Sequence, residues 1–303
     1  MKTMKDGGAV RLALAMILCL TMAPAVHAAE DLPADRYIGG FPVGCQAYMF
    51  HRFTLFEGIE KTHAAGGKII ELFPTQRFSK EEPDVRVDQN LSDDDIAKLK
   101  AKLKENDVLA VSIGVIDIPR DEAGARKVFD FARKMGLRCI TTEPAREQMD
   151  LLEKLVKEYD IQLAIHDHPR RASEPDYQFW DPHYVASLVA GRDARMGAMA
   201  DVGHWTRSGV NPLEALKILQ GHIIGCHLKD IVEAGNPDAP DVPLGEGVTG
   251  VGAILAELHR MQFKGYIFME YERDWENSLP DIAACIGYVR GFGDAEKLRP
   301  AGN

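Results

Sequence analysis

The sequence predicts an α/β protein built as a single (β/α)8 barrel, and three observations support that prediction. Eight short apolar runs rich in β-branched residues alternate with amphipathic segments over about 230 residues. No shift in composition and no linker divides this stretch, which favours one domain. An open doubly wound sheet has the same alternation, but the Gly-x-Gly-x-x-Gly turn of its dinucleotide-binding form does not follow the first run.

Each predicted strand–helix unit begins with its strand, and the strands are short. They are residues 43–50, 68–73, 108–116, 137–142, 161–165, 196–200, 223–228 and 266–269. Amphipathic periodicity between them predicts helices over 93–106, 123–135, 147–159, 182–189, 212–219 and 251–261. Ser92 is placed to cap the first of these helices, and Pro182 and Pro212 suit first-turn positions, where no backbone N–H is needed.

The N-terminal segment 1–28 has the pattern of a secretory signal peptide. Three basic residues precede an apolar stretch, residues 12–26, which is shorter than the ~20 residues of a membrane-spanning helix. We expect cleavage after Ala28, which leaves residues 29–303 as a barrel domain that is exported to the periplasm and has no membrane anchor.

Net charge and cysteine placement bear on the partners and the thiol state that we expect for this chain. The chain has 46 acidic and 36 basic residues, a formal net charge of −10, and the signal segment removes more positive than negative charge. An acidic chain without a basic run argues against nucleic acid as a partner. The four cysteines after the signal segment stand singly among apolar residues, which predicts buried free thiols: Cys45, Cys139, Cys226 and Cys285.

Polar residues collect at the C-terminal ends of the expected strands. The C-terminal ends of all barrel strands meet on one rim, where active sites of this fold form. Side chains alternate between the barrel interior and the helix layer, so strand parity predicts which of them point inward. The strand-end residues are Glu71, Glu143, His166 with His168, Asp201 with His204, His227 with Lys229, and Glu270 with Glu272. The inward set includes Glu143, His166, Asp201, His227 and Glu270.

Carboxylates that converge in one cavity repel one another unless a cation lies between them. A mixture of carboxylate and imidazole donors suits one divalent ion of the Mn²⁺, Zn²⁺ or Co²⁺ type, whereas an all-oxygen set suits Mg²⁺ or Ca²⁺. The inward set is therefore the expected metal site. For Glu143, which precedes Pro144, capping of the next helix is an alternative.

The motifs Asp201-Val202-Gly203-His204, His227-Leu228-Lys229-Asp230 and Glu270-Tyr271-Glu272 resemble those of the sugar phosphate isomerase/epimerase family of xylose isomerase-like TIM barrels. The resemblance covers nearly all of residues 29–303, and the His-Asp-His motif looks like that of an exported subgroup. Further matching motifs are Ile165-His166-Asp167-His168-Pro169, Thr142-Glu143-Pro144 and Pro243-Leu244-Gly245-Glu246-Gly247.

The resemblance implies a metal-binding barrel that acts on carbohydrate-like substrates, with Asp201, His227 and Glu270 as metal ligands. The epimerase branch has a glutamate where this chain has His166, a departure that puts a two-carboxylate epimerase mechanism in doubt. Glu143, on the neighbouring strand, is the candidate for the missing carboxylate ligand.

The expected function is that of a metal-dependent isomerase or epimerase acting through an enediolate on a non-phosphorylated keto sugar or sugar derivative. One alternative is a lyase that performs β-elimination on 3-keto-glycosides, which begins with the same proton abstraction. A non-catalytic carbohydrate-binding barrel is an alternative of another class. A nuclease is disfavoured, because it calls for extra histidines on the second and third strands, 68–73 and 108–116, which have none. Homo-oligomer formation stays open.

Several rim residues have expected roles in that chemistry. Glu270 is a candidate base, although metal coordination would weaken it, and His168 is a candidate acid–base group or a residue that orients His166. Lys229 is expected to stabilise an oxyanion or to pair with a glutamate, and His204 to bind the metal or a substrate hydroxyl. The expected substrate-binding residues are Glu71, Trp205, Arg207, Tyr48 and His51.

Overall fold

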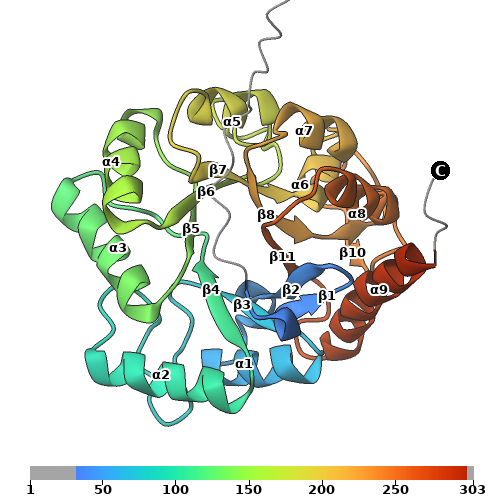
Figure 1. Cartoon of the computed structure of the whole chain (residues 1–303). Coiled ribbons are helices and arrows are strands. Elements are labelled where there is room, and N and C mark those ends of the chain that lie inside the picture. Colours follow the sequence, from blue (N-terminus) through green and yellow to red (C-terminus); the bar gives the residue numbers. More distant parts are fainter. Residues whose placement is uncertain (1–31, 299–303) are drawn as a thin grey trace, which may run out of the picture.

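In the computed structural model, which describes residues 32–298, eight parallel strands form a closed barrel surrounded by helices (Figure 1). Each strand pairs with the next along the chain, and the last strand pairs with the first to close the barrel. The predicted (β/α)8 barrel is therefore confirmed. The expected signal peptide lies outside the described residues.

The strands match their predicted positions with one clear exception at the first of them. The predicted strand 43–50 ends at Gln46, where the side chain accepts a hydrogen bond from the backbone N–H of Tyr48 and turns the chain into a 3₁₀ helix, η2 (Ala47–Phe50). The barrel strands are β2 (Phe41–Gln46), β3 (Ile69–Leu72), β4 (Leu109–Ile113), β5 (Cys139–Thr142), β6 (Gln162–His166), β7 (Met196–Asp201), β8 (Ile223–Leu228) and β11 (Tyr266–Met269). Short strands lie outside the barrel wall: β1 (Tyr37–Ile38), β9 (Asp230–Ile231) and β10 (Asp241–Val242).

All six predicted helices are present, and Ser92 caps the first of them by accepting a hydrogen bond from Asp95 N. They are α2 (Asp93–Glu105), α3 (Glu122–Met135), α4 (Met149–Tyr159), α5 (Pro182–Val189), α7 (Pro212–Ile218) and α8 (Val251–Arg260). The described residues also contain α1 (Leu55–Ala64), α6 (Val202–Arg207), α9 (Leu279–Lys297), η1 (Ala34–Arg36) and η3 (Arg146–Gln148). A capping box between Thr54 and Glu57 begins α1, a signal that the sequence contains.

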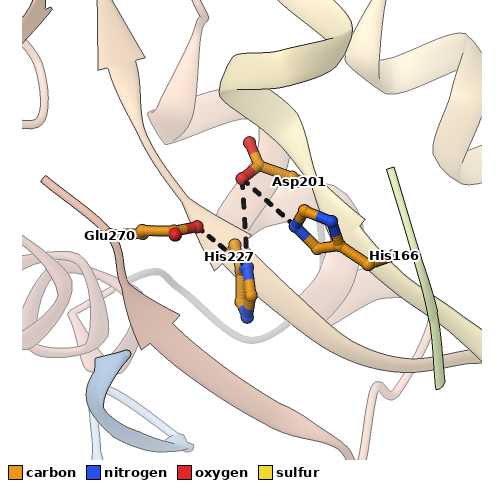
Figure 2. Close-up of side chains that lie close together, drawn as sticks. All are labelled: His166, Asp201, His227 and Glu270. Atoms are coloured by element: carbon orange, nitrogen blue, oxygen red, sulfur yellow. Dashed lines mark ion pairs between the residues drawn. The ribbon is translucent and has the colours of Figure 1, made fainter. Parts of the chain in front are cut away.

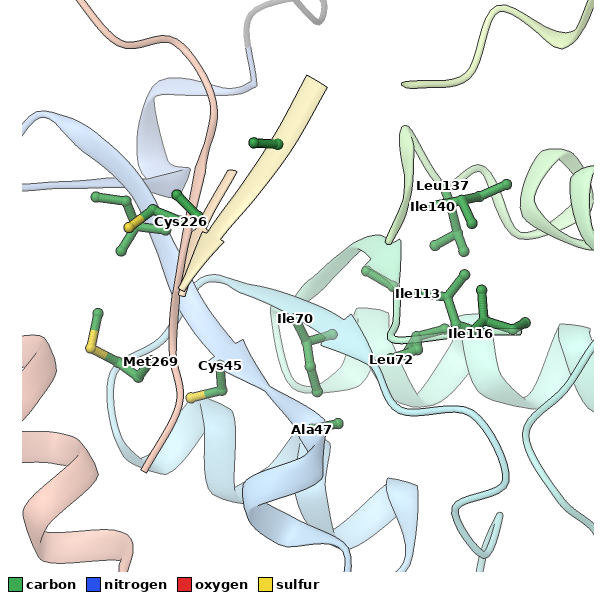
Figure 3. Packing of buried hydrophobic residues seen from close by; sticks show 14 of the residues in the cluster. Cys45, Ala47, Ile70, Leu72, Ile113, Ile116, Leu137, Ile140, Cys226 and Met269 are labelled. Carbon is green, nitrogen blue, oxygen red and sulfur yellow. The ribbon is translucent and has the colours of Figure 1, made fainter. Parts of the chain in front are cut away.

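Two apolar layers hold the barrel together, as strand parity predicts. One fills the barrel interior and includes Val111, Cys139 and Phe268. The other lies between strands and helices, and Figure 3 shows Cys45 and Cys226 among its members. All four cysteines in the described part of the chain are free and buried, as expected.

No helix within residues 32–298 has both the length and the apolar character needed to cross a bilayer.

Candidate active site

Four neighbouring strands deliver four metal-binding side chains to the C-terminal rim of the barrel. His166 ends β6, Asp201 ends β7, His227 lies near the end of β8, and Glu270 directly follows β11. Asp201 and His227 are register partners in the β7–β8 pair. Figure 2 shows the four side chains pointing toward one another.

One donor atom from each of these residues lies within 4.8 Å of the others. The carboxylate Oδ2 of Asp201 is 3.8 Å from Nε2 of His166 and 3.9 Å from Nδ1 of His227. The Nδ1 atom of His227 lies 2.9 Å from Oε2 of Glu270. All four side chains are buried.

The same four atoms are buried without a hydrogen-bond partner: His166 Nε2, Asp201 Oδ2, His227 Nδ1 and Glu270 Oε2. Buried polar atoms without hydrogen bonds are costly, and the His227–Glu270 contact and Lys229 compensate these four atoms only in part. A single cation could contact all four. Two imidazole nitrogens and two carboxylate oxygens are a donor set that suits a divalent transition metal ion. The residues present therefore fit such an ion.

Behind His227 lies Glu71, which we expected to bind substrate. Its side chain is buried and faces His227, so we assign it to the support of His227, and the expected substrate contact stays a prediction. Glu71 Oε1 lies 3.1 Å from His227 Nε2, and Thr141 Oγ1 donates to Glu71 Oε2 at 2.8 Å. Burial alone would raise the pKa of Glu71, but its interactions with His227 lower it overall. The Glu71 carboxylate thus accepts a hydrogen bond from Nε2–H of His227. The lone pair on Nδ1 of His227 then faces the other three metal-binding side chains.

Glu143 occupies the equivalent position behind His166. Its Oε1 lies 3.2 Å from His166 Nδ1 and 2.5 Å from His168 Nδ1, and it accepts a hydrogen bond from the hydroxyl of Tyr177 at 2.9 Å. Glu143, His166 and His168 form a second group with metal-ligand spacing. In this group, however, the atoms are already engaged with one another. These contacts fit a role of Glu143 in supporting His166, and its expected role as a metal ligand stays a prediction.

Tyr177 is a site residue that the sequence did not reveal. Its hydroxyl also accepts a hydrogen bond from the backbone N–H of His168, at 2.9 Å. It lies in the connection between β6 and α5, where no periodic pattern marks individual residues. The unusual length of that connection is the signal that could have drawn attention to it.

Lys229 is buried beside the four donors, and its ammonium group contacts two of them. Its Nζ lies 3.1 Å from Asp201 Oδ2, 3.3 Å from Glu270 Oε2 and 3.1 Å from Glu272 Oε1. Burial alone would lower the pKa of Lys229, but these carboxylates raise it above its usual value. Lys229 is therefore a fixed positive charge at the site.

His204 lies beside this ammonium group, with its Nε2 2.9 Å from Lys229 Nζ and 3.5 Å from Asp201 Oδ2. Burial lowers the pKa of His204 well below its usual value, and the charge of Lys229 adds to that shift against the opposing effect of Asp201. A neutral imidazole that already accepts from Lys229 has no free acceptor for a substrate proton. The expected catalytic role of His204 is not supported by this arrangement.

Trp205 and Arg207, two of the expected substrate-binding residues, lie in α6. Asp201 caps this helix by accepting a hydrogen bond from His204 N at 2.8 Å, so the helix begins directly after β7. Trp205 is 1% exposed and packs in the apolar layer between strands and helices, which excludes sugar stacking. Arg207 is buried and pairs with Asp241. Neither residue is available as a substrate contact.

Aromatic side chains lie in the segments that follow β2, β3 and β11. Tyr48 and His51 are half-buried and stack at 4.8 Å between ring centroids. Trp275 follows β11 and contacts both rings edge-on, at 5.6 Å from Tyr48 and 4.5 Å from His51. Phe73, just after β3, contacts Tyr48 at 5.0 Å. The sequence pointed to Tyr48 and His51 but missed Trp275, which lies beyond the last strand-end motif.

The sequence profile of the xylose isomerase-like TIM barrel family matches residues 59–288. No curated protein sequence matches the chain. A solved structure of an uncharacterized protein from Parabacteroides distasonis is 33% identical, with a TM-score of 0.67, over 83% of this chain and 98% of that one.

Two more distant structures share the fold at 16% identity. A D-tagatose 3-epimerase-like protein has a TM-score of 0.64 over 85% of this chain and 99% of its own. The IolI protein, solved with a bound zinc atom, has a TM-score of 0.57 over 85% of this chain and 99% of its own. The profile and the Parabacteroides distasonis relative both cover most of the sequence, and the chain belongs to the xylose isomerase-like TIM barrel family.

Proposed function

We propose that this protein is a metal-dependent isomerase or epimerase that acts through an enediolate on a non-phosphorylated keto sugar or sugar derivative. The convergence of four buried donor atoms without hydrogen-bond partners is the observation that carries the proposal. The epimerase-like and zinc-containing structures of the same fold agree with it.

His166, Asp201, His227 and Glu270 would hold the ion. A divalent ion bound there supplies Lewis-acid polarisation of a substrate carbonyl. Lys229 adds a positive charge beside two of the same donors and stabilises negative charge that develops on a substrate oxygen.

His168 is the proton-transfer group in this proposal. Its side chain is 34% exposed, and its Nδ1 is held by Glu143 at 2.5 Å. With Nδ1–H donating to that carboxylate, Nε2 carries the lone pair that accepts a proton from the carbon next to the carbonyl. The C–H electrons form the carbon–carbon double bond while the carbonyl π electrons move to oxygen. For the isomer, the proton returns to the former carbonyl carbon while the hydroxyl proton of the adjacent carbon passes to the oxyanion, so that the carbonyl moves by one carbon. For the epimer, water delivers a proton to the original carbon on its opposite face, and His168 releases the proton it took to solvent.

Elimination from a 3-keto-glycoside is a second candidate, and His166 is the observation that favours it. An imidazole stands where the epimerase branch has a carboxylate, so the second base for the opposite face of the substrate has no counterpart at that position. Elimination needs one base at the carbon next to the ketone, and His168 suffices for that step.

Deuterium exchange tests the proposal. The metal-loaded protein is incubated in D₂O with a panel of ketoses and, separately, with a 3-keto-glycoside, and the products are followed by NMR. Deuterium uptake without aglycone release supports the isomerase, and aglycone release supports the lyase. His168→Asn should abolish exchange while metal content stays unchanged, whereas His183→Asn, an exposed histidine on α5, should behave as wild type. A protein that takes up no divalent ion and exchanges no deuterium would be a non-catalytic barrel, and the proposal would fail.

We also propose that residues 1–28 direct export and are removed, on the sequence pattern described above. N-terminal sequencing of the protein recovered from the periplasm should begin at Ala29. Recovery of an intact Met1 terminus would contradict this.

A further inference from the structure

The ammonium group of Lys229 is held in a fixed position inside the active site. Its side chain is buried, and its stem packs so closely against α6 that a Cβ at Gly203 would lie 2.4 Å from Lys229 Cβ. The ammonium group donates hydrogen bonds to His204 Nε2 at 2.9 Å and to Glu272 Oε1 at 3.1 Å. These contacts lie outside the four donor residues, so they can hold Lys229 in place when a ligand enters the site.

Lys229 also contacts two of the four donor atoms, but through charge and not through hydrogen bonds. Its Nζ is 3.1 Å from Asp201 Oδ2 and 3.3 Å from Glu270 Oε2. Neither of these oxygens has a hydrogen-bond partner in residues 32–298. Each oxygen therefore keeps a lone pair for an ion, and the ammonium group does not have to leave when an ion binds.

A divalent ion in the site would be repelled by this ammonium group. An ion bonded to Asp201 Oδ2 at the usual length of about 2.1 Å lies at most about 5 Å from Nζ, because Nζ is 3.1 Å from that oxygen. At that separation, the repulsion between a single and a double positive charge lowers affinity by more than about tenfold even at the dielectric constant of water. The repulsion is greater in a buried site, where screening is weaker.

In the metal-free protein the same charge is favourable, because buried carboxylates are costly without a counter-charge. Asp201 and Glu270 are both buried, and Lys229 contacts both. We propose that Lys229 is the resident counterion of the metal-free site: it balances Asp201 and Glu270 before an ion binds and lowers the affinity of the site for that ion. The proposal rests on the proposed function, since it takes the four donor residues as the metal site.

Lys229→Met tests the effect on affinity, with Lys102→Met as the matched control. Lys102 is half-buried and pairs with Glu60 on α1 and Glu105 on α2, so both variants lose one positive charge but only one loses it at the site. The measurement is a competition titration of the metal-free protein with Zn²⁺ and a chromophoric chelator. We expect Lys229→Met to bind Zn²⁺ at least about tenfold more tightly than wild type, and Lys102→Met to keep wild-type affinity.

Thermal unfolding gives a second readout that needs no turnover. Without metal, Lys229→Met should melt at least about 5 °C below wild type, because two buried carboxylates lose their counter-charge. Saturating Zn²⁺ should raise the melting temperature of Lys229→Met by more than it raises that of wild type, since the variant binds the ion more tightly. Lys102→Met should show the same Zn²⁺-induced rise as wild type.

Glu272→Gln should change the affinity in the opposite direction. Glu272 is partly exposed and accepts from Lys229, so glutamine keeps the shape and leaves more of the ammonium charge unbalanced. We expect Zn²⁺ binding to weaken by about threefold or more. General loosening of the site would weaken binding in both variants, so opposite changes identify an effect of charge.

The possible results separate this proposal from the proposed function. Zn²⁺ affinity that is unchanged or weakened in Lys229→Met would overturn the counterion role alone, as would an equal gain in Lys102→Met. If Lys229→Met does not fold, unchanged or tighter Zn²⁺ binding in Glu272→Gln would overturn it. Tighter binding in Lys229→Met, together with no deuterium exchange by wild type, would refute the proposed function alone. Absence of Zn²⁺ uptake by every form would refute both.

Discussion

Replacing Glu143 by glutamine tests how the metal donors are held in position. Burial alone would raise the pKa of Glu143, but hydrogen bonds from His166 and His168 lower it well below its usual value, so the group is a carboxylate at neutral pH. Its Oε1 lies 3.2 Å from His166 Nδ1, and this contact favours the tautomer with a free lone pair on Nε2. Glutamine keeps the shape but removes the charge, and its amide N–H can donate to Nδ1 and favour the wrong tautomer.

The expected loss of metal affinity follows from the effect that a supporting carboxylate has on a metal-binding histidine. Loss of a carboxylate behind a metal-binding histidine weakens metal affinity by about 10- to 100-fold, which equals about 1.4–2.7 kcal/mol. Competition titration of the metal-free protein with Zn²⁺ and a chromophoric chelator measures this, and the Co²⁺ absorption spectrum reports whether coordination is retained. Glu147→Gln, an exposed change on η3, is the control and should have no effect.

Two outcomes would refute this reasoning. Unchanged Zn²⁺ affinity in Glu143→Gln would show that Glu143 does not orient His166. A loss greater than about 1000-fold, together with little effect of His166→Ala, would show that Glu143 is itself a ligand.

Three further predictions follow from the same site. Asp201→Asn, which keeps the helix-capping oxygen, should abolish metal binding and leave the circular dichroism spectrum unchanged; retained metal would refute the site. Burial alone would lower the pKa of His227, but Glu270 and a second glutamate raise it to about 10 in the metal-free protein. Against the effect of burial, Asp201 and Glu143 also raise the pKa of His166, so metal uptake at pH 7 should release at least one proton and tighten as pH rises toward 10, which calorimetry in buffers of different ionisation enthalpy would measure. Gly203→Ala would place a Cβ 2.4 Å from Cβ of Lys229 and should lower the free energy of unfolding by about 1–3 kcal/mol; an unchanged melting temperature would contradict the close packing of α6.

Strand parity explains why much of the site was predictable. In a strand, alternate side chains face the same way, so His227 could be placed inward and Cys226 outward from the sequence alone. The structure places Cys226 in the layer between strands and helices and His227 among the donor residues, in agreement with that rule. The parity argument stops where a strand ends. It gives no orientation for Trp205 and Arg207, because Asp201 starts a helix at that point.

The sequence by itself determined the alternation of strands and helices, the closure into a barrel that this alternation favours, and the residue types at each strand end. These are local properties, because they depend on side-chain period and on neighbours in the chain. Only the tertiary structure decided which groups support the donors and which rings stand on the rim. Glu71 and His227 are 156 residues apart and meet inside the closed barrel, and Tyr177 reaches Glu143 from a connection without periodicity. Contacts of this kind depend on how distant segments are brought together in space, which no local pattern records.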